Sequence, residues 1–218
     1  MKWSRHEHGP HGGHGRAGYH HGNLREALIE AALSLIAANG STGFTFAEAA
    51  RQAGVSPAAP YRHFRDRDAL MADVAQLGFD KFEAELARGW NQGVPDALTA
   101  LNNIGKAYLA FARSQPGYYG AMFEAGIPLN ATPALRDASD RAFAILRGAA
   151  EQIIAKLPDG TRPPALMVAL HFWSLSHGIA SLFVGRNAAQ RTLPMPPEDL
   201  LEAGVLVYLQ GLGLSKPG

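Results

Sequence analysis

The chain has 218 residues, of which 47% are hydrophobic and 18% are charged, and its formal net charge is +1. This length and composition can form one large domain, or a small domain beside a mid-sized one, around a hydrophobic core. With so little net charge, any binding to nucleic acid must come from a local basic patch. The chain has no cysteine, which excludes disulfide scaffolds, thiolate metal sites and cysteine nucleophiles.

The beginning of the chain lacks core-forming residues. Residues 1–22 are rich in glycine and contain six of the nine histidines. Such a composition cannot bury enough apolar surface to fold, so we expect a flexible arm over residues 1–21. Its histidines could hold nickel, copper or zinc loosely, but a disordered run does not preorganise a defined metal site.

The first predicted helix follows this arm. Asn23 and Glu26 have the spacing of a capping box, in which each side chain bonds a backbone N–H at the start of a helix. Apolar residues then recur at helical spacing. Asn39-Gly40 ends the helix, because glycine adopts the left-handed cap without steric cost.

Two short helices around a tight turn come next. Thr45 and Glu48 form a second capping box, and Gly54 ends the helix that they open. Ser56 and Pro57 then open another helix, with serine as the N-cap and proline at the first helical position. This arrangement is typical of a helix-turn-helix, whose second helix lies in the major groove of DNA.

The rest of the chain also has helical periodicity and almost no period-two alternation, so sheets are not expected. Asp66 caps a long helix over about 67–88. Further helices are predicted at about 96–115, 117–125, 133–157, 164–185 and 197–212. The uncharged helix that ends at Gly185 is long enough to cross a membrane, but its two histidines and three serines favour a helix buried in protein. We therefore predict an all-α protein with about nine helices.

Residues 45–64, TFAEAARQAGVSPAAPYRHF, carry a family resemblance together with the charged run that follows them. Over residues 22–82 the chain resembles the DNA-binding domain of the TetR family of transcriptional regulators. Trp173 with His177-Gly178 resembles a motif of one C-terminal domain class in that family. The resemblance implies a cytoplasmic, dimeric repressor, with a three-helix DNA-binding domain at 22–82. A long helix would join it to a ligand-binding and dimerisation domain at 83–218.

The resemblance also implies how DNA is held. Tyr61, His63 and Arg67 match positions that contact backbone phosphates, and Thr45 offers a hydroxyl at a helix N-terminus. These contacts position the protein without reading sequence. The other predicted DNA contacts are Phe46, Ser56, Pro57, Ala58, Ala59 and Arg62.

Base reading is harder to assign. Residues 57–60, Pro-Ala-Ala-Pro, have no side-chain hydrogen-bond donor, so the two alanines can only touch a thymine methyl. Arg62 or Arg51 could reach a base edge; otherwise groove shape or the N-terminal arm would supply specificity. Pro60 lacks an N–H and crowds the preceding turn, so we expect a tight or 3₁₀-like first turn there.

The resemblance places a ligand cavity among the central helices of the C-terminal part. The predicted lining residues are Phe111, Tyr118, Met122, Phe143, Trp173 and His177. Trp173 and His177 share a helix face, and His177 could anchor a polar group of a mostly apolar effector. A stripe of small, weakly polar residues on the same helix suits a dimer interface with the last helix. The stripe consists of His171, Ser174, Gly178, Ser181 and Gly185.

Three other functions compete with this interpretation. The sequence has none of the common catalytic motifs, so we expect no enzyme activity and no cofactor. A metal-responsive protein would rest only on the histidine-rich arm, and no defined metal site is predicted. A pure interaction module would explain the helices but not the helix-turn-helix pattern.

Overall fold

The computed structural model describes residues 24–184 and 194–214, and this part of the chain is all-helical, as predicted. The capping box expected at Asn23, the N-terminal arm and Gly185 lie outside the described residues. Eight α-helices and two 3₁₀ segments occur in the described part. They are α1 Leu24–Asn39, α2 Phe46–Gln52, η1 Ala59–Arg62, α3 Arg67–Trp90, η2 Asn91–Gly93, α4 Ala97–Ser114, α5 Pro116–Phe123, α6 Pro133–Ile154, α7 Ala165–Phe183 and α8 Pro197–Gly211.

The predicted caps of the helix-turn-helix are present. Thr45 and Glu48 form both bonds of the capping box at the start of α2, and the Asp66 side chain accepts from the backbone N–H of Ala69 at the start of α3. Gly54 has a φ of 72° in the turn after α2, a conformation that glycine adopts without strain. These local signals fix the helix boundaries.

The predicted α-helix beginning at Ser56 and Pro57 is wrong. The chain forms turns and then η1, whose N-cap is Ala58 and has no side-chain bond. Ala59 N–H donates to the Ser56 carbonyl at 3.0 Å, three residues back, and the Pro60 carbonyl accepts from His63 N–H at 2.9 Å. Because Pro60 has no N–H, the first i to i−4 bond of an α-helix cannot form. The tight turn expected at Pro60 therefore extends over all of η1, the segment in the place of the recognition helix.

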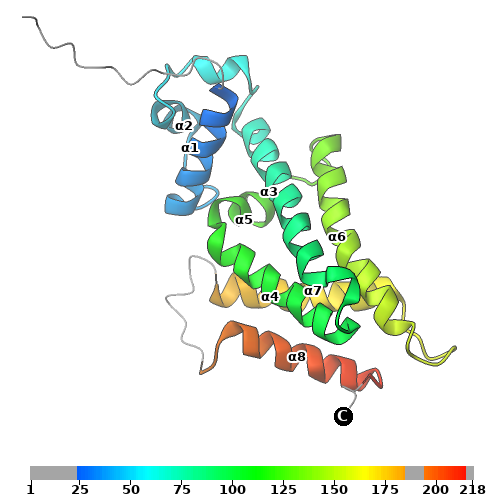
Figure 1. Ribbon diagram of the computed structural model, residues 1–218. Coiled ribbons are helices and arrows are strands. Elements are labelled where there is room, and N and C mark those ends of the chain that lie inside the picture. Colours follow the sequence, from blue (N-terminus) through cyan, green and yellow to red (C-terminus); the bar gives the residue numbers. More distant parts are fainter. Residues whose placement is uncertain (1–23, 185–193, 215–218) are drawn as a thin grey trace, which may run out of the picture.

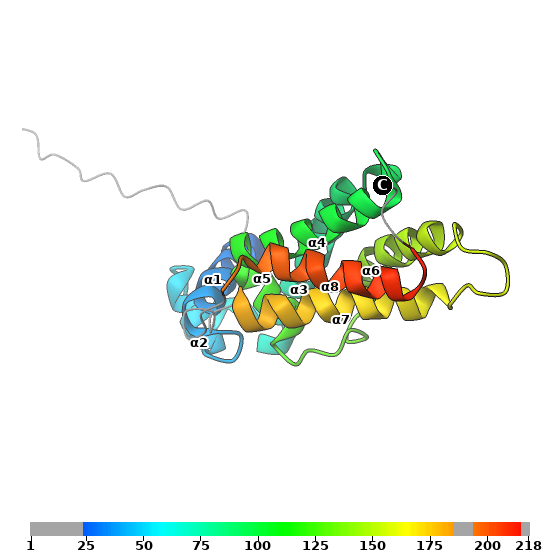
Figure 2. The ribbon, with the colours of Figure 1, turned by 90° about the horizontal axis from the view of Figure 1, so that it is seen from below.

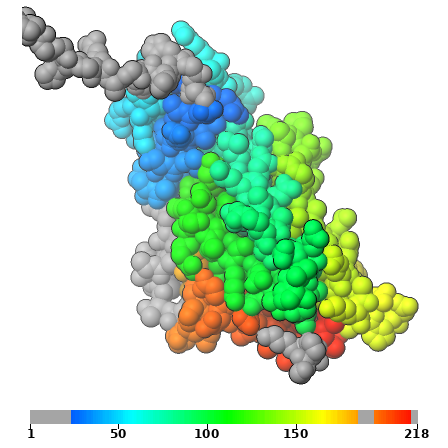
Figure 3. Space-filling model, in the orientation of Figure 1, coloured from blue at the N-terminus to red at the C-terminus, as the bar shows by residue number. Residues whose placement is uncertain are grey.

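One long helix joins the two ends of the molecule. In Figure 1, α3 runs from the end formed by α1 and α2 into the bundle of the remaining helices, with α6 alongside it. Its buried residues begin with Leu70 beside the helix-turn-helix and end with Trp90 in the bundle. The α1–α2 end and α8 lie at opposite ends of the molecule (Figure 3). The domain boundary expected at residue 82 falls inside α3.

Helices α7 and α8 lie side by side across the lower face of the molecule (Figure 2). Both helices carry exposed apolar side chains, which are Leu166, Met167, Leu170 and Leu182 on α7 and Leu206 and Val207 on α8. Of the predicted stripe, His171 and Ser174 are exposed, but Ser181 faces inward and lies within hydrogen-bond distance of Tyr119. Helix α7 is apolar and long enough to cross a membrane, and it packs against α4, α6 and α8.

Candidate functional sites: an exposed helix-turn-helix surface and an apolar cavity

The helix-turn-helix pairs an exposed aromatic ring, Tyr61, with a half-buried one, Phe46. Tyr61 on η1 is 63% exposed, and its ring meets Phe46 of α2 edge-on, with centroids 5.0 Å apart and an interplanar angle of 83°. This edge-to-face contact holds the Tyr61 ring in place. The phenol of Tyr61 is therefore held where it can donate to a phosphate oxygen.

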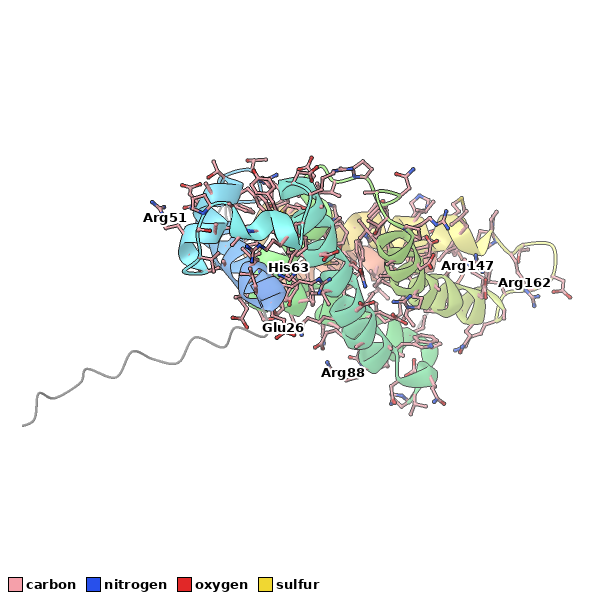
Figure 4. The ribbon with its side chains drawn as sticks, turned by 90° about the horizontal axis from the view of Figure 1, so that it is seen from above. Glu26, Arg51, His63, Arg88, Arg147 and Arg162 are labelled. Atoms are coloured by element: carbon pink, nitrogen blue, oxygen red, sulfur yellow. The ribbon has the colours of Figure 1, made fainter. Side chains whose placement is uncertain are left out.

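The polar groups around this pair are also at the surface. Arg51, Arg62 and His63 are all exposed, and Figure 4 shows Arg51 projecting from α2 and His63 on the same end of the molecule. Ser56, Pro57 and Ala58 are exposed beside them, and Ala59 is half-buried. The surface can thus offer two arginines and an imidazole to an anionic polymer, while residues 57–60 offer only apolar groups.

Thr45 is already engaged within the protein. Its hydroxyl lies 2.9 Å from Glu48 Oε2, and its backbone N–H donates to the same oxygen at 2.7 Å. The backbone N–H of Thr45, and then its hydroxyl, lower the pKa of Glu48. The hydroxyl predicted to contact DNA is therefore committed to a carboxylate that stays ionised.

Arg67 also has a task inside the protein. Its Nε donates to the Phe44 carbonyl at 3.1 Å, and Nη2 donates to the Ser41 carbonyl. The guanidinium carbon lies 4.7 Å from the centroid of the Phe44 ring, and the side chain is 25% exposed. Arg67 thus holds the loop before α2 to the start of α3, and these two bonds use only two of the five N–H groups of its guanidinium.

The second site is a cavity of about 460 Å³ among α3, α5, α6 and α7, a size typical of small-molecule sites. Its lining is mostly apolar and aromatic, with only three polar residues. The lining residues are Phe79, Phe82, Met122, Phe123, Ile127, Leu129, Ser139, Asp140, Ala142, Phe143, Leu146, Leu170, Trp173 and His177.

The structure brings four of the six predicted cavity residues to this lining: Met122, Phe143, Trp173 and His177. Phe111 instead packs behind the wall against Phe82, with ring centroids 5.0 Å apart. The ring of Tyr118 lies 5.6 Å from the Lys81 ammonium group and is not part of the wall.

Sequence reasoning missed the contribution of α3 to the cavity. Phe79 and Phe82 line it, although the sequence places both within the segment expected to form the DNA-binding domain. The available signal was their spacing of three, which puts both rings on one helix face. The helix that follows the helix-turn-helix, α3, therefore also forms part of the cavity wall.

A polar network closes the inner side of the cavity. Trp173 Nε1 donates to the Tyr108 hydroxyl at 3.3 Å, and that hydroxyl lies 3.0 Å from His177 Nδ1. The Tyr119 hydroxyl lies 3.1 Å from the same nitrogen and 3.3 Å from Ser181 Oγ. Burial lowers the pKa of His177 and raises the pKa of both tyrosines. All of these groups are consequently neutral near pH 7.

Comparisons with known proteins agree with this arrangement. Residues 28–74 match the family model for bacterial regulatory proteins of the tetR family, and residues 101–208 match a tetracyclin repressor-like C-terminal domain. The HTH-type transcriptional regulator YobS of Bacillus subtilis is 25% identical over 198 residues, which cover 88% of this chain and 93% of YobS.

Solved structures share the fold. A protein of unknown function from Rhodococcus sp. RHA1 superimposes with a TM-score of 0.73 at 28% identity, covering 92% of this chain and 100% of that one. AibR in complex with isovaleryl coenzyme A and operator DNA has a TM-score of 0.64 at 17% identity, covering 85% and 97%.

Proposed function

Because this chain belongs to the TetR family of DNA-binding transcriptional regulators, we propose that it is a ligand-responsive repressor. It would bind a palindromic operator as a dimer in the bacterial cytoplasm and be released by a small, mostly apolar effector. The observation that carries this proposal is α3, which begins at the helix-turn-helix and contributes Phe79 and Phe82 to the cavity wall. Occupancy of the cavity therefore acts on the helix that holds the DNA-binding surface.

The exposed face of α7 and α8 supports a dimer. Leu166, Leu182 and Val207 are 51%, 43% and 69% exposed on these neighbouring helices. Several large apolar side chains exposed on one face mark a surface that another protein covers. A second copy related by two-fold symmetry would cover it with the same helices and form a four-helix interface. It would also present two recognition elements to successive major grooves.

Release by an effector follows from population shift. A ligand that fits the cavity better in one position of α3 than in another stabilises that position. A shift of α3 changes the separation of the two helix-turn-helix surfaces in a dimer, so that they no longer match the operator. The complex of AibR with isovaleryl coenzyme A and operator DNA shows a protein of this fold with both kinds of ligand.

Catalysis is not part of the proposed function. The described partners of His177 are the hydroxyls of Tyr108, Tyr119 and Ser181, so no carboxylate orients this imidazole as in a hydrolytic triad. The same neutral network suits recognition of an uncharged ligand group.

Hydroxyl-radical footprinting on the DNA upstream of the protein's own gene tests the proposal. The expected result is a protected, near-palindromic site whose half-sites lie about 10 base pairs apart or a multiple of that distance. Protection should disappear when a ligand fills the cavity. Uniform protection along the DNA, or none below the concentration that coats bulk DNA, would overturn the assignment.

A further inference from the structure

The charge of the cavity restricts what it can bind. Eleven of its fourteen lining residues are apolar, the other three are Ser139, Asp140 and His177, and none is a lysine or arginine. A carboxylate or phosphate buried without a cationic partner loses its hydration without compensation. The lining therefore lacks the groups that would hold an anion.

Asp140 strengthens this selection. Its exposed carboxylate belongs to the cavity lining, and the nearby arginines on α6 are paired elsewhere. Arg141 bonds Asp80 at 2.6 Å and Glu83 at 3.0 Å on α3, and Arg136 lies 3.9 Å from Asp137. The carboxylate thus places a negative charge at the cavity lining, which disfavours an anion beside it.

Ser139 does not offer a free donor. Its side chain is buried, and Oγ donates to the Arg136 carbonyl at 2.8 Å. His177 is consequently the residue in the lining that can give a directed hydrogen bond to a ligand.

The network around His177 favours one of the two neutral tautomers of its imidazole. Trp173 can only donate, so the Tyr108 hydroxyl accepts from it and has its own proton free for His177 Nδ1 at 3.0 Å. The Tyr119 hydroxyl can donate to Ser181 Oγ at 3.3 Å. The single lone pair of an unprotonated Nδ1 then accepts from Tyr108 alone, and the one proton of the neutral imidazole lies on Nε2. The described protein partner of Nε2 is Ser181 Oγ at 3.4 Å, a long contact that a ligand atom can replace.

We infer that the effector is an uncharged, largely aromatic or alicyclic molecule whose hydrogen-bond acceptor meets the Nε2–H of His177, and that the cavity rejects anions. This inference rests on the proposed ligand-responsive function and names the chemical class of its effector. A carbonyl or ether oxygen on a compact apolar body has this chemistry. The hydrocarbon part would lie among Phe79, Phe143 and Trp173.

Two fluorescent probes with one skeleton test the charge selection. N-phenyl-1-naphthylamine is uncharged, and 8-anilinonaphthalene-1-sulfonate carries an additional sulfonate. The wild-type protein should bind the uncharged probe at least about tenfold more tightly. Asp140→Asn should reduce this preference by tightening sulfonate binding, whereas Glu26→Gln, at an exposed carboxylate on α1 outside the lining, should leave it unchanged. Leu170→Trp places a larger side chain in the cavity wall. The part of the fluorescence signal that this variant loses comes from probe bound in the cavity.

The ketone probe 6-propionyl-2-(dimethylamino)naphthalene tests the role of His177, because its emission shifts to the red when its carbonyl accepts a hydrogen bond. We expect the bound probe to emit further to the red in the wild type than in His177→Phe, which keeps an aromatic ring but removes the N–H. Ser139→Ala should behave as the wild type. Equal emission in all three proteins would overturn the assignment of His177 as the donor.

The outcomes separate this inference from the proposed function. If the sulfonate probe binds in the cavity as tightly as the uncharged probe, the effector class is wrong. The ligand-responsive function would then stand if filling the cavity still releases DNA. If filling the cavity leaves DNA binding unchanged, the proposed function fails and the effector class fails with it.

Discussion

Replacement of Arg67 tests whether this residue is a structural fastener or a phosphate contact. Its guanidinium donates to the carbonyls of Ser41 and Phe44, two residues that are 5% and 4% exposed, and lies over the Phe44 ring. Arg67→Ala removes both bonds and leaves the carbonyls without their donor. The loop before α2 is then held to α3 by packing alone.

The expected loss of stability follows from these contacts. A hydrogen bond to a charged group is worth about 1.5 to 3 kcal/mol, and a cation–π contact at a partly exposed site contributes about 0.5 to 1 kcal/mol. Because the loop can relax and water can reach part of the site, we expect a net loss of about 2 to 4 kcal/mol. For a chain of this length, that corresponds to a fall in Tm of about 5 to 15 °C.

Thermal unfolding followed by circular dichroism, together with DNA affinity over a salt series, separates the two roles. In the fastener role, Arg67→Lys lowers Tm nearly as much as Arg67→Ala, because an ammonium group cannot reproduce the fork of donors that bonds both carbonyls. Arg65→Ala is the control, since Arg65 has an 87% exposed side chain and its ion pair among the described residues is with its neighbour Asp66. If both Arg67 variants keep the wild-type Tm and Arg67→Ala lowers the salt slope by about 0.9, the residue contacts phosphate and the structural reasoning is refuted.

The other predictions concern DNA reading, assembly and pH. Since residues 57–60 have no side-chain donor, replacing contacted operator thymines by deoxyuridine should weaken binding about fourfold per lost methyl group, or about 0.8 kcal/mol; unchanged affinity would exclude methyl contacts. Val207→Glu on α8 should convert the dimer to a monomer in sedimentation experiments, whereas Ala144→Glu, exposed on α6, should not; a dimer in both variants would place the interface elsewhere. Burial lowers the pKa of His177 below 6.5, so the unfolded state binds this proton first, and the free energy of unfolding should fall as pH drops below about 6.5. Denaturant titrations should show a smaller fall in His177→Phe, and identical pH profiles would contradict the neutral, buried state.

Local signals in the sequence were sufficient to place most helices. Capping residues such as Thr45 and Asp66 and the turn at Gly54 act through bonds between near neighbours, so the pattern alone predicts the boundaries. Pro60 indicated a tight turn for the same reason. The sequence did not show that the segment between Pro60 and Phe64 is too short to form an α-helix after that proline.

Features that depend on contacts distant in the sequence could not be predicted in the same way. Arg67 has the charge and position of a phosphate contact, and only the folded loop shows that two carbonyls lie within its reach. Ser181 and Leu182 are about 100° apart around the axis of α7. A small error in the predicted rotation of this helix therefore assigns the wrong one of the two to the exposed face. Phe79 lines the cavity because α5 and α6, which are distant in the sequence, pack against this part of α3.

The central claim is that the exposed helix-turn-helix surface binds one DNA sequence in preference to others. Its most direct test is fluorescence anisotropy with the footprinted duplex and a scrambled duplex across a salt series, for the wild type and for Tyr61→Phe and His63→Ala. The account predicts binding of the specific duplex at least about a thousandfold tighter than the scrambled one, with weaker binding by both variants at unchanged Tm. Equal affinity for the two duplexes, or indifference to both substitutions, would contradict it.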